Sequence, residues 1–142
     1  MAASTITISR TVPARPETVF ADWTDATRLA TWWWPQLPGT TYAVDARPGG
    51  AYRIEGPAIG ATVSGTYAEV DPPRRLVFSW VWQDDGEPAS GSDTVVVSFE
   101  PDGAATAVTV AHTSERHEPG GATEQGWSDV LGRLVQSTSS RS

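Results

Sequence analysis

The sequence predicts a single α+β domain in which a seven-stranded antiparallel sheet wraps around a long C-terminal helix, with two short helices between the first and second strands. Six runs rich in β-branched and aromatic residues follow one another between residues 40 and 112, which is typical of an antiparallel meander. After residue 120, apolar residues recur at helical spacing. A curved sheet and an amphipathic helix each have one apolar face, and packing one against the other buries both. The length of 142 residues fits one such domain.

The N-terminal part is expected to form one strand and two short helices. "STITISRTV" (4–12) alternates between apolar and polar residues, as a half-buried strand does. The first helix is expected in "PARPETVFADWTD" (13–25), where Pro16 suits the first helical turn. The second is expected in "DATRLATWW" (25–33), with Asp25 as its N-cap and two prolines beyond its end.

Turn clusters rich in glycine, proline and aspartate separate the strands that follow. These strands are expected at 40–46, 50–56, 61–70, 74–82, 93–100 and 104–112. The C-terminal helix is expected over about 120–137, with Trp127, Leu131 and Leu134 facing the sheet and a frayed tail, "STSSRS", beyond it.

The composition argues against several classes of function. The formal net charge is −7 and the ten basic residues are scattered arginines, whereas a nucleic-acid partner needs a basic patch. Without cysteine, the chain has no disulfide, thiol nucleophile or thiolate metal site. No apolar run reaches the ~20 residues of a membrane span, and the N-terminus lacks the features of a secretory signal. We therefore expect a cytoplasmic protein.

Motifs of catalysis and cofactor binding are not found. The sequence contains no Gly-x-Ser-x-Gly, no phosphate-binding Gly-Lys-Ser/Thr and no Gly-x-Gly-x-x-Gly. His112 and His117, with Glu115 and Glu118 nearby, lack the spacing with which one helix or one strand face holds a metal. We expect no metal, no cofactor and no catalytic residue.

The stretch "TWWWPQLPG" (31–39) places three tryptophans in a row. Successive residues of a helix point about 100° apart, so at most two of the three can join the core. We expect Trp32 in the core, with Trp33 and Trp34 on the rim of a cavity or plugging its mouth.

Two strands contribute further candidates for a binding site. Trp80 and Trp82 share one face of their strand with Leu76 and Phe78. The two tryptophans can belong either to the core or to the lining of a pocket. His112 faces inward on the last strand, either as a hydrogen-bonded histidine at the edge of the core or as a polar contact for a ligand. The full set of expected ligand-binding residues is Trp33, Trp34, Phe78, Trp80, Trp82, His112 and Trp127.

Several stretches together resemble one known family. They are "RLATWWWP" (28–35), "VDARPGGAYRIEG" (44–56), "GTYAEVDPPRRLVFSW" (65–80) and "GW…VLGRL" (126–134). They resemble the activator-of-heat-shock-protein-ATPase-like domains of the START-like (SRPBCC) superfamily, which shares the helix-grip fold with polyketide cyclases and the birch-pollen allergen. The resemblance covers roughly residues 5–136. The family often has glycine where this chain has Trp34.

The resemblance and the tryptophans together predict a binding domain with an apolar, aromatic-lined cavity for a small hydrophobic or lipid-like molecule. The first alternative is a co-chaperone-like domain of the stress response, whose partner is a chaperone or a second copy of the chain. The second alternative is a cyclase- or hydrolase-like enzyme, as some helix-grip relatives are. A cavity-facing carboxylate or histidine with a strongly perturbed pKa would favour this second alternative.

Overall fold

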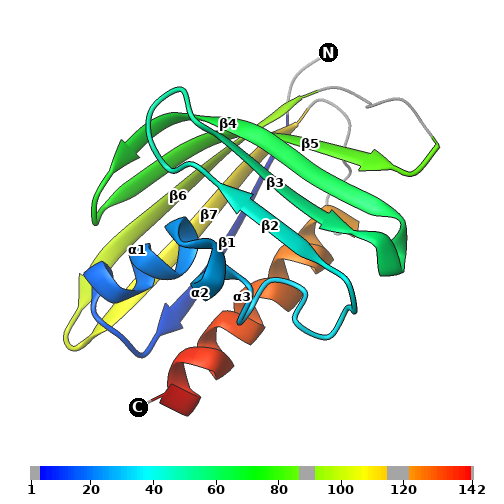
Figure 1. Cartoon of the computed structure of the whole chain (residues 1–142). Helices are drawn as coiled ribbons and strands as arrows, with labels where there is room; N and C mark the ends of the chain where they lie inside the picture. Colours follow the sequence, from blue (N-terminus) through cyan, green and yellow to red (C-terminus); the bar gives the residue numbers. More distant parts are fainter. Residues whose placement is uncertain (1–3, 87–91, 115–121, 142) are drawn as a thin grey trace.

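The computed structural model of the chain describes residues 4–86, 92–114 and 122–141. Seven strands form one antiparallel sheet in the order β1-β7-β6-β5-β4-β3-β2, which arches over the long helix α3 (Figure 1). The strands are β1 (Ser4–Val12), β2 (Thr41–Val44), β3 (Ala51–Gly56), β4 (Ala61–Asp71), β5 (Arg75–Asp84), β6 (Asp93–Asp102) and β7 (Ala105–Ser114). The helices are α1 (Pro16–Thr24), α2 (Ala26–Leu29), the 3₁₀ turn η1 (Pro57–Ile59) and α3 (Ala122–Arg141). The predicted fold is confirmed.

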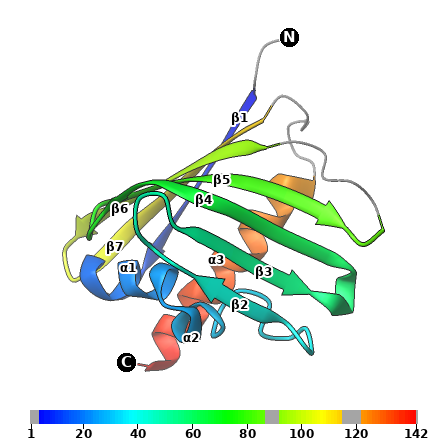
Figure 2. The ribbon, with the colours of Figure 1, turned by 45° about the horizontal axis from the view of Figure 1, so that its top comes forward.

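The two short helices lie on the same side of the sheet as α3 (Figure 2). Pro16 occupies the start of α1, as predicted. Asp25 ends α1 and caps α2, because its carboxylate accepts hydrogen bonds from the backbone N–H groups of Thr27, at 2.9 Å, and Arg28, at 3.2 Å. The tight junction between the helices holds both of them against the sheet.

The second helix is shorter than predicted. It ends at Leu29 instead of Trp33. Thr31 and Trp32 then make bonds of the 3₁₀ type, in which each N–H donates to the carbonyl three residues earlier, that of Arg28 and that of Leu29. The Thr31 hydroxyl also donates to the Arg28 carbonyl at 2.6 Å, so this side chain competes with a further helical turn. The Trp33 N–H still bonds to the Leu29 carbonyl at 2.9 Å, so the chain runs through hydrogen-bonded turns as far as Trp33 and changes direction at Trp34.

The C-terminal helix is longer than predicted, and the expectation of a frayed tail is wrong. α3 continues to Arg141, and hydroxyl groups in its last turns donate back to carbonyls four residues earlier, from Thr138 at 2.7 Å and Ser139 at 2.9 Å. Trp127, Leu131 and Leu134 are buried, as the periodicity predicted. No helix in the described part of the chain is long and apolar enough to cross a membrane.

Glycine allows the close approaches that bend the sheet. A Cβ on Gly65 of β4 would lie 2.0 Å from the Ser79 carbonyl oxygen of β5, and the register of this pair shifts between Tyr67 and Glu69. A Cβ on Gly50, just before β3, would likewise lie 2.0 Å from the Asp45 carbonyl oxygen. The resulting curvature makes room for helices and aromatic side chains on the concave face.

Candidate functional site

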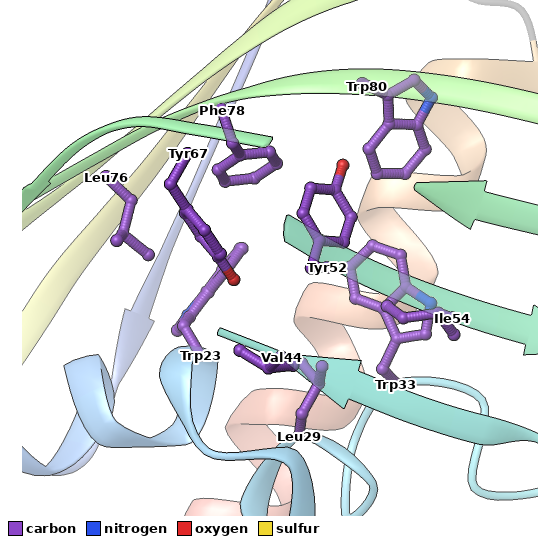
Figure 3. A pocket seen from close by; sticks show the side chains of 10 residues that line it. All are labelled: Trp23, Leu29, Trp33, Val44, Tyr52, Ile54, Tyr67, Leu76, Phe78 and Trp80. Carbon is purple, nitrogen blue, oxygen red and sulfur yellow. The ribbon is translucent and has the colours of Figure 1, made fainter. Parts of the chain in front are cut away.

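A small apolar pocket lies on the concave side of the sheet, between β2–β5 and the two short helices (Figure 3). Its lining consists of aromatic and aliphatic side chains, which are Trp23, Leu29, Trp33, Val44, Tyr52, Ile54, Tyr67, Leu76, Phe78 and Trp80. Its volume is about 30 Å³, which is room for one or two water-sized groups. Typical pockets for small molecules measure roughly 300–1,000 Å³. Large side chains therefore fill most of the space that the sequence led us to expect as a cavity.

All three consecutive tryptophans are buried. Trp32 is 0% exposed, which confirms its place in the core, and its indole N–H donates to the Asp22 carbonyl at 3.0 Å. Trp33 and Trp34 are only 5% and 8% exposed, so the expectation that they cannot all turn inward is wrong. The reason is the backbone, which forms turns instead of a continuous helix up to Trp33 and adopts a left-handed conformation at Trp34, with a φ of 55°. The three side chains therefore enter the core from different directions.

The Trp34 ring packs against the backbone of Gly56 at the end of β3. A Cβ on Gly56 would lie 2.8 Å from this ring, so no other residue fits there without movement. The Trp82 ring meets the Trp34 ring edge-on, with 5.9 Å between their centroids. Trp82 itself is 37% exposed near the end of β5.

Trp33 lies at the centre of an aromatic cluster. Its ring centroid is 5.6 Å from that of Trp32, 6.0 Å from Trp34, 5.9 Å from Trp80 and 5.4 Å from Trp127. Tilted and edge-on aromatic pairs each contribute about 0.5–1.5 kcal/mol beyond the area they bury. Trp33 therefore lines the pocket and at the same time packs against Trp80 on β5 and Trp127 on α3.

His112 is fully buried beneath the ring of Trp80, which confirms that it faces inward. The indole N–H of Trp127 donates to His112 Nδ1 at 2.9 Å. An indole nitrogen can only donate, so Nδ1 accepts and the proton of the neutral ring sits on Nε2. Nε2 then donates to Asp93 Oδ2 at 2.8 Å. Both ring nitrogens are thus engaged in joining β6, β7 and α3.

The structure brings together only part of the expected site. Trp33, Phe78 and Trp80 line the pocket. The other four expected residues do not line it, and they are Trp34, Trp82, His112 and Trp127. His117, Glu115 and Glu118 lie outside the described residues. Within the described residues no three His, Asp or Glu side chains gather closely enough to hold a metal, and the absence of a metal stays a prediction.

Sequence reasoning missed seven of the ten lining residues, which are the aromatic Trp23, Tyr52 and Tyr67 and the aliphatic Leu29, Val44, Ile54 and Leu76. A signal existed for Tyr52, because it alternates with charged residues in "AYRIEG" and so had to face inward. Burial raises the pKa of both tyrosines above the ordinary value, with a smaller contribution from the charge of Asp45 in the case of Tyr67. Both hydroxyls therefore stay protonated at neutral pH and can donate hydrogen bonds.

The polar groups of the pocket fall into two kinds. The Tyr52 hydroxyl donates to the Ser79 carbonyl at 2.7 Å. By contrast, the indole N–H groups of Trp23 and Trp33 are buried and have no hydrogen-bond partner among the described residues. Of the side chains that line the pocket, none is a carboxylate, an imidazole or a cation. The lining is therefore an apolar surface with hydroxyl and indole groups and without an ionised side chain.

Comparisons with known proteins give one family and many similar folds. The family described as "Activator of Hsp90 ATPase homolog 1-like protein" matches residues 13–138. No curated protein sequence matches significantly. A solved protein of Rhizobium loti is 21% identical with a TM-score of 0.77, over 96% of this chain and 97% of that one. One from Chromobacterium violaceum is 25% identical with a TM-score of 0.77, over 94% and 96%. An HSP90 activator from Plasmodium falciparum is 24% identical with a TM-score of 0.68, over 92% of each chain.

Proposed function

The chain belongs to the Activator of Hsp90 ATPase homolog 1-like family, and we propose that it is a binding domain for a small apolar molecule held in the pocket between the sheet and the short helices. The family membership agrees with the resemblance that the sequence carried. Since one fold hosts many functions, the proposal rests on the pocket and not on the family alone.

The observation that carries this proposal is unfilled apolar space in the most aromatic part of the core. Protein interiors are close-packed, and voids larger than a water molecule are few in a domain. Here ten side chains from α1, α2, the Trp33 loop and four strands line a partly open apolar pocket of about 30 Å³. An apolar ligand group in this space would gain contacts with aromatic rings on several sides.

The size of the pocket limits the ligand to a compact molecule or to the narrow end of a longer one. Val44 lines the pocket from the edge strand β2 and is half-buried. Leu29 closes the pocket from α2, a helix of four residues. Because so short a helix has little stability of its own, its displacement can widen the pocket for a larger ligand.

Binding can be tested with xenon, a single apolar atom that suits so small a pocket, applied to ¹⁵N-labelled protein while the tryptophan indole signals are recorded. We expect saturable shifts of the Trp33 signal. Val44→Phe should abolish them by filling the pocket, whereas Val77→Phe, on the opposite face of β5, should leave them unchanged. Binding that survives Val44→Phe, or no saturable shift in the unmodified protein, would overturn the proposal.

A second candidate function is contact with a chaperone, as the name of the family suggests. Ile59 and Trp82 are the exposed large hydrophobic residues of the described chain, and both lie beside Trp34. If they form a contact surface, the protein should stimulate the ATPase of Hsp90, and Ile59→Ser with Trp82→Ser should remove the stimulation. Stimulation that is absent, or unaffected by both substitutions, would exclude this surface.

A further inference from the structure

We propose that the edge strand β1 pairs with β1 of a second copy of the chain, so that two sheets join into one across a twofold axis at Thr7. This inference does not depend on the pocket or on its ligand. It follows from the open edge of β1, from the lack of protection on that edge and from the nearly palindromic sequence of the strand.

β1 is the last strand of the sheet and pairs with β7 (Figure 2). The hydroxyls of Thr5 and Ser9 bond to those of Thr113 and Thr109, which stand directly opposite on β7, at 2.8 and 2.9 Å. Side chains come this close in the pairs of an antiparallel ladder whose backbone groups point away from each other. In agreement, the Ser9 carbonyl accepts a bond from the Arg10 side chain at 2.8 Å, as a carbonyl on the outer edge can.

The direction of the backbone groups alternates along a strand. The N–H and C=O groups of Thr5, Thr7, Ser9 and Thr11 therefore all face the outer edge, and all four residues are exposed. Such a row of donors and acceptors is a template on which another strand can pair.

The usual protections of an edge strand are missing from most of β1. Proteins protect edges with short strands, prolines, bulges or charged side chains. β2, at the other end of the sheet, has four residues, whereas β1 has nine, contains no proline and keeps an unbroken register with β7. Its charged residue, Arg10, also donates to Ser128 of α3 at 2.9 Å. The Ser9 carbonyl to which Arg10 bonds has a second lone pair and can accept from an incoming strand as well.

The sequence of this edge indicates its occupant. "TITIS" (5–9) reads nearly the same in both directions, so an antiparallel copy centred on Thr7 places like residues opposite each other. Ile6 then lies opposite Ile8 of the second copy, and Thr5 lies opposite Ser9. Each Thr7 N–H donates to the Thr7 carbonyl of the other copy, since both face the edge. Cross-strand pairs of β-branched residues and of hydroxyl groups stabilise antiparallel strands, and a twofold dimer needs this kind of self-complementarity.

Sedimentation equilibrium of the full chain tests the inference. A single pair of strands is a small interface, so we expect a weak dimer, whose average mass rises from that of one chain toward that of two between micromolar and millimolar concentration. Thr7→Pro removes the N–H that each copy donates at the axis and should hold the mass at that of one chain. Because this N–H makes no bond within the sheet, the variant should still fold. Thr7→Val keeps the N–H and should dimerise like the unmodified protein.

Cysteine variants test the register by a second route, which does not require the proline variant to fold. The chain has no cysteine, and Thr7→Cys would place two thiols opposite each other, with Cα atoms about 5.5 Å apart, within the range of a disulfide. Thr11→Cys is equally exposed on the same strand, but in this register its two copies lie roughly 27 Å apart. Under mild oxidation at millimolar concentration, Thr7→Cys should form the disulfide dimer roughly tenfold faster than Thr11→Cys.

Three results would overturn the inference. They are a mass that stays at one chain up to millimolar concentration, a dimer that survives in folded Thr7→Pro, and equal cross-linking of the two cysteine variants.

Discussion

The indole of Trp127 on α3 donates to the Nδ1 atom of His112 on β7, and this bond fixes the tautomer of a histidine that is wholly enclosed by protein. The pair joins the C-terminal helix to β7, the strand beside the edge strand β1. The other ring nitrogen of His112, Nε2, donates to Asp93 on β6, so this imidazole connects β6, β7 and α3.

The first prediction concerns this connection. His112→Phe should lower the free energy of unfolding by about 2–4 kcal/mol, because it leaves a buried indole N–H and a nearly buried carboxylate without the imidazole. Urea denaturation of His112→Phe, Trp127→Phe and the double variant checks it. The double variant should cost less than the sum of the single ones, because each substitution breaks the same bond. Strict additivity would mean that the bond contributes nothing.

The second prediction concerns Trp34. Because this residue is buried, Trp34→Ala should cost roughly 3–5 kcal/mol, and not the small amount expected of an exposed residue. Its φ of 55° adds a more specific expectation, since glycine adopts this conformation without strain. Trp34→Gly should therefore be more stable than Trp34→Ala by about 1 kcal/mol, in thermal or urea unfolding. The reverse order would contradict the left-handed backbone at this position.

The third prediction is a stabilising one. Gly126 and Gly132 lie inside α3, and a Cβ at either position would meet nothing within 4 Å. Gly126→Ala and Gly132→Ala should each raise the free energy of unfolding by roughly 0.5–1 kcal/mol, because alanine loses less entropy in a helix. Gly65→Ala is the contrasting variant and should be strongly destabilising, since its Cβ would lie 2.0 Å from a carbonyl oxygen. Equal effects at all three sites would contradict the packing described.

The fourth prediction concerns alkaline pH. The pKa of each of the three tyrosines, Tyr42, Tyr52 and Tyr67, is raised in the folded protein, mainly by burial, above the ordinary value of 10.0. Raised pKa values stabilise the fold fully below pH 10, and this stability is lost as the pH rises above that value. In a Tyr42→Phe variant, which leaves only the two buried tyrosines, we expect phenolate absorbance to appear only together with loss of the circular dichroism signal. Tyrosine ionisation that precedes unfolding would contradict the burial.

Much of the fold could be predicted because its signals are local. Alternation along β1 and the helical period in α3 depend on neighbours in sequence, and Asp25 is both a helix end and a cap whatever surrounds it. The site was harder, because its volume depends on how side chains from six elements and one loop pack together. The partners of His112 and the lack of partners for Trp23 are likewise set by residues far away in the sequence.

The error at Trp34 has a clear physical origin. The triplet was assigned to a helix, where successive side chains diverge, but the chain leaves the helix at Leu29. Tryptophan rarely adopts a positive φ, so the residue itself gave no hint of the turn. The family often has glycine at this position, and a glycine that recurs is the usual sign of a left-handed backbone. The glycine of the family was therefore a better indicator of the backbone conformation at position 34 than the tryptophans of this chain.

The packing of Trp34 on Gly56 has a consequence for how this sequence can change over time. Since the ring lies where a Cβ of residue 56 would be, a side chain at 56 is tolerated only after position 34 has become small. The two sites should therefore mutate in a fixed order, first 34 and then 56. A library randomised at both positions and selected for folding should return glycine at 56 whenever tryptophan is kept at 34, and a wider choice when it is not.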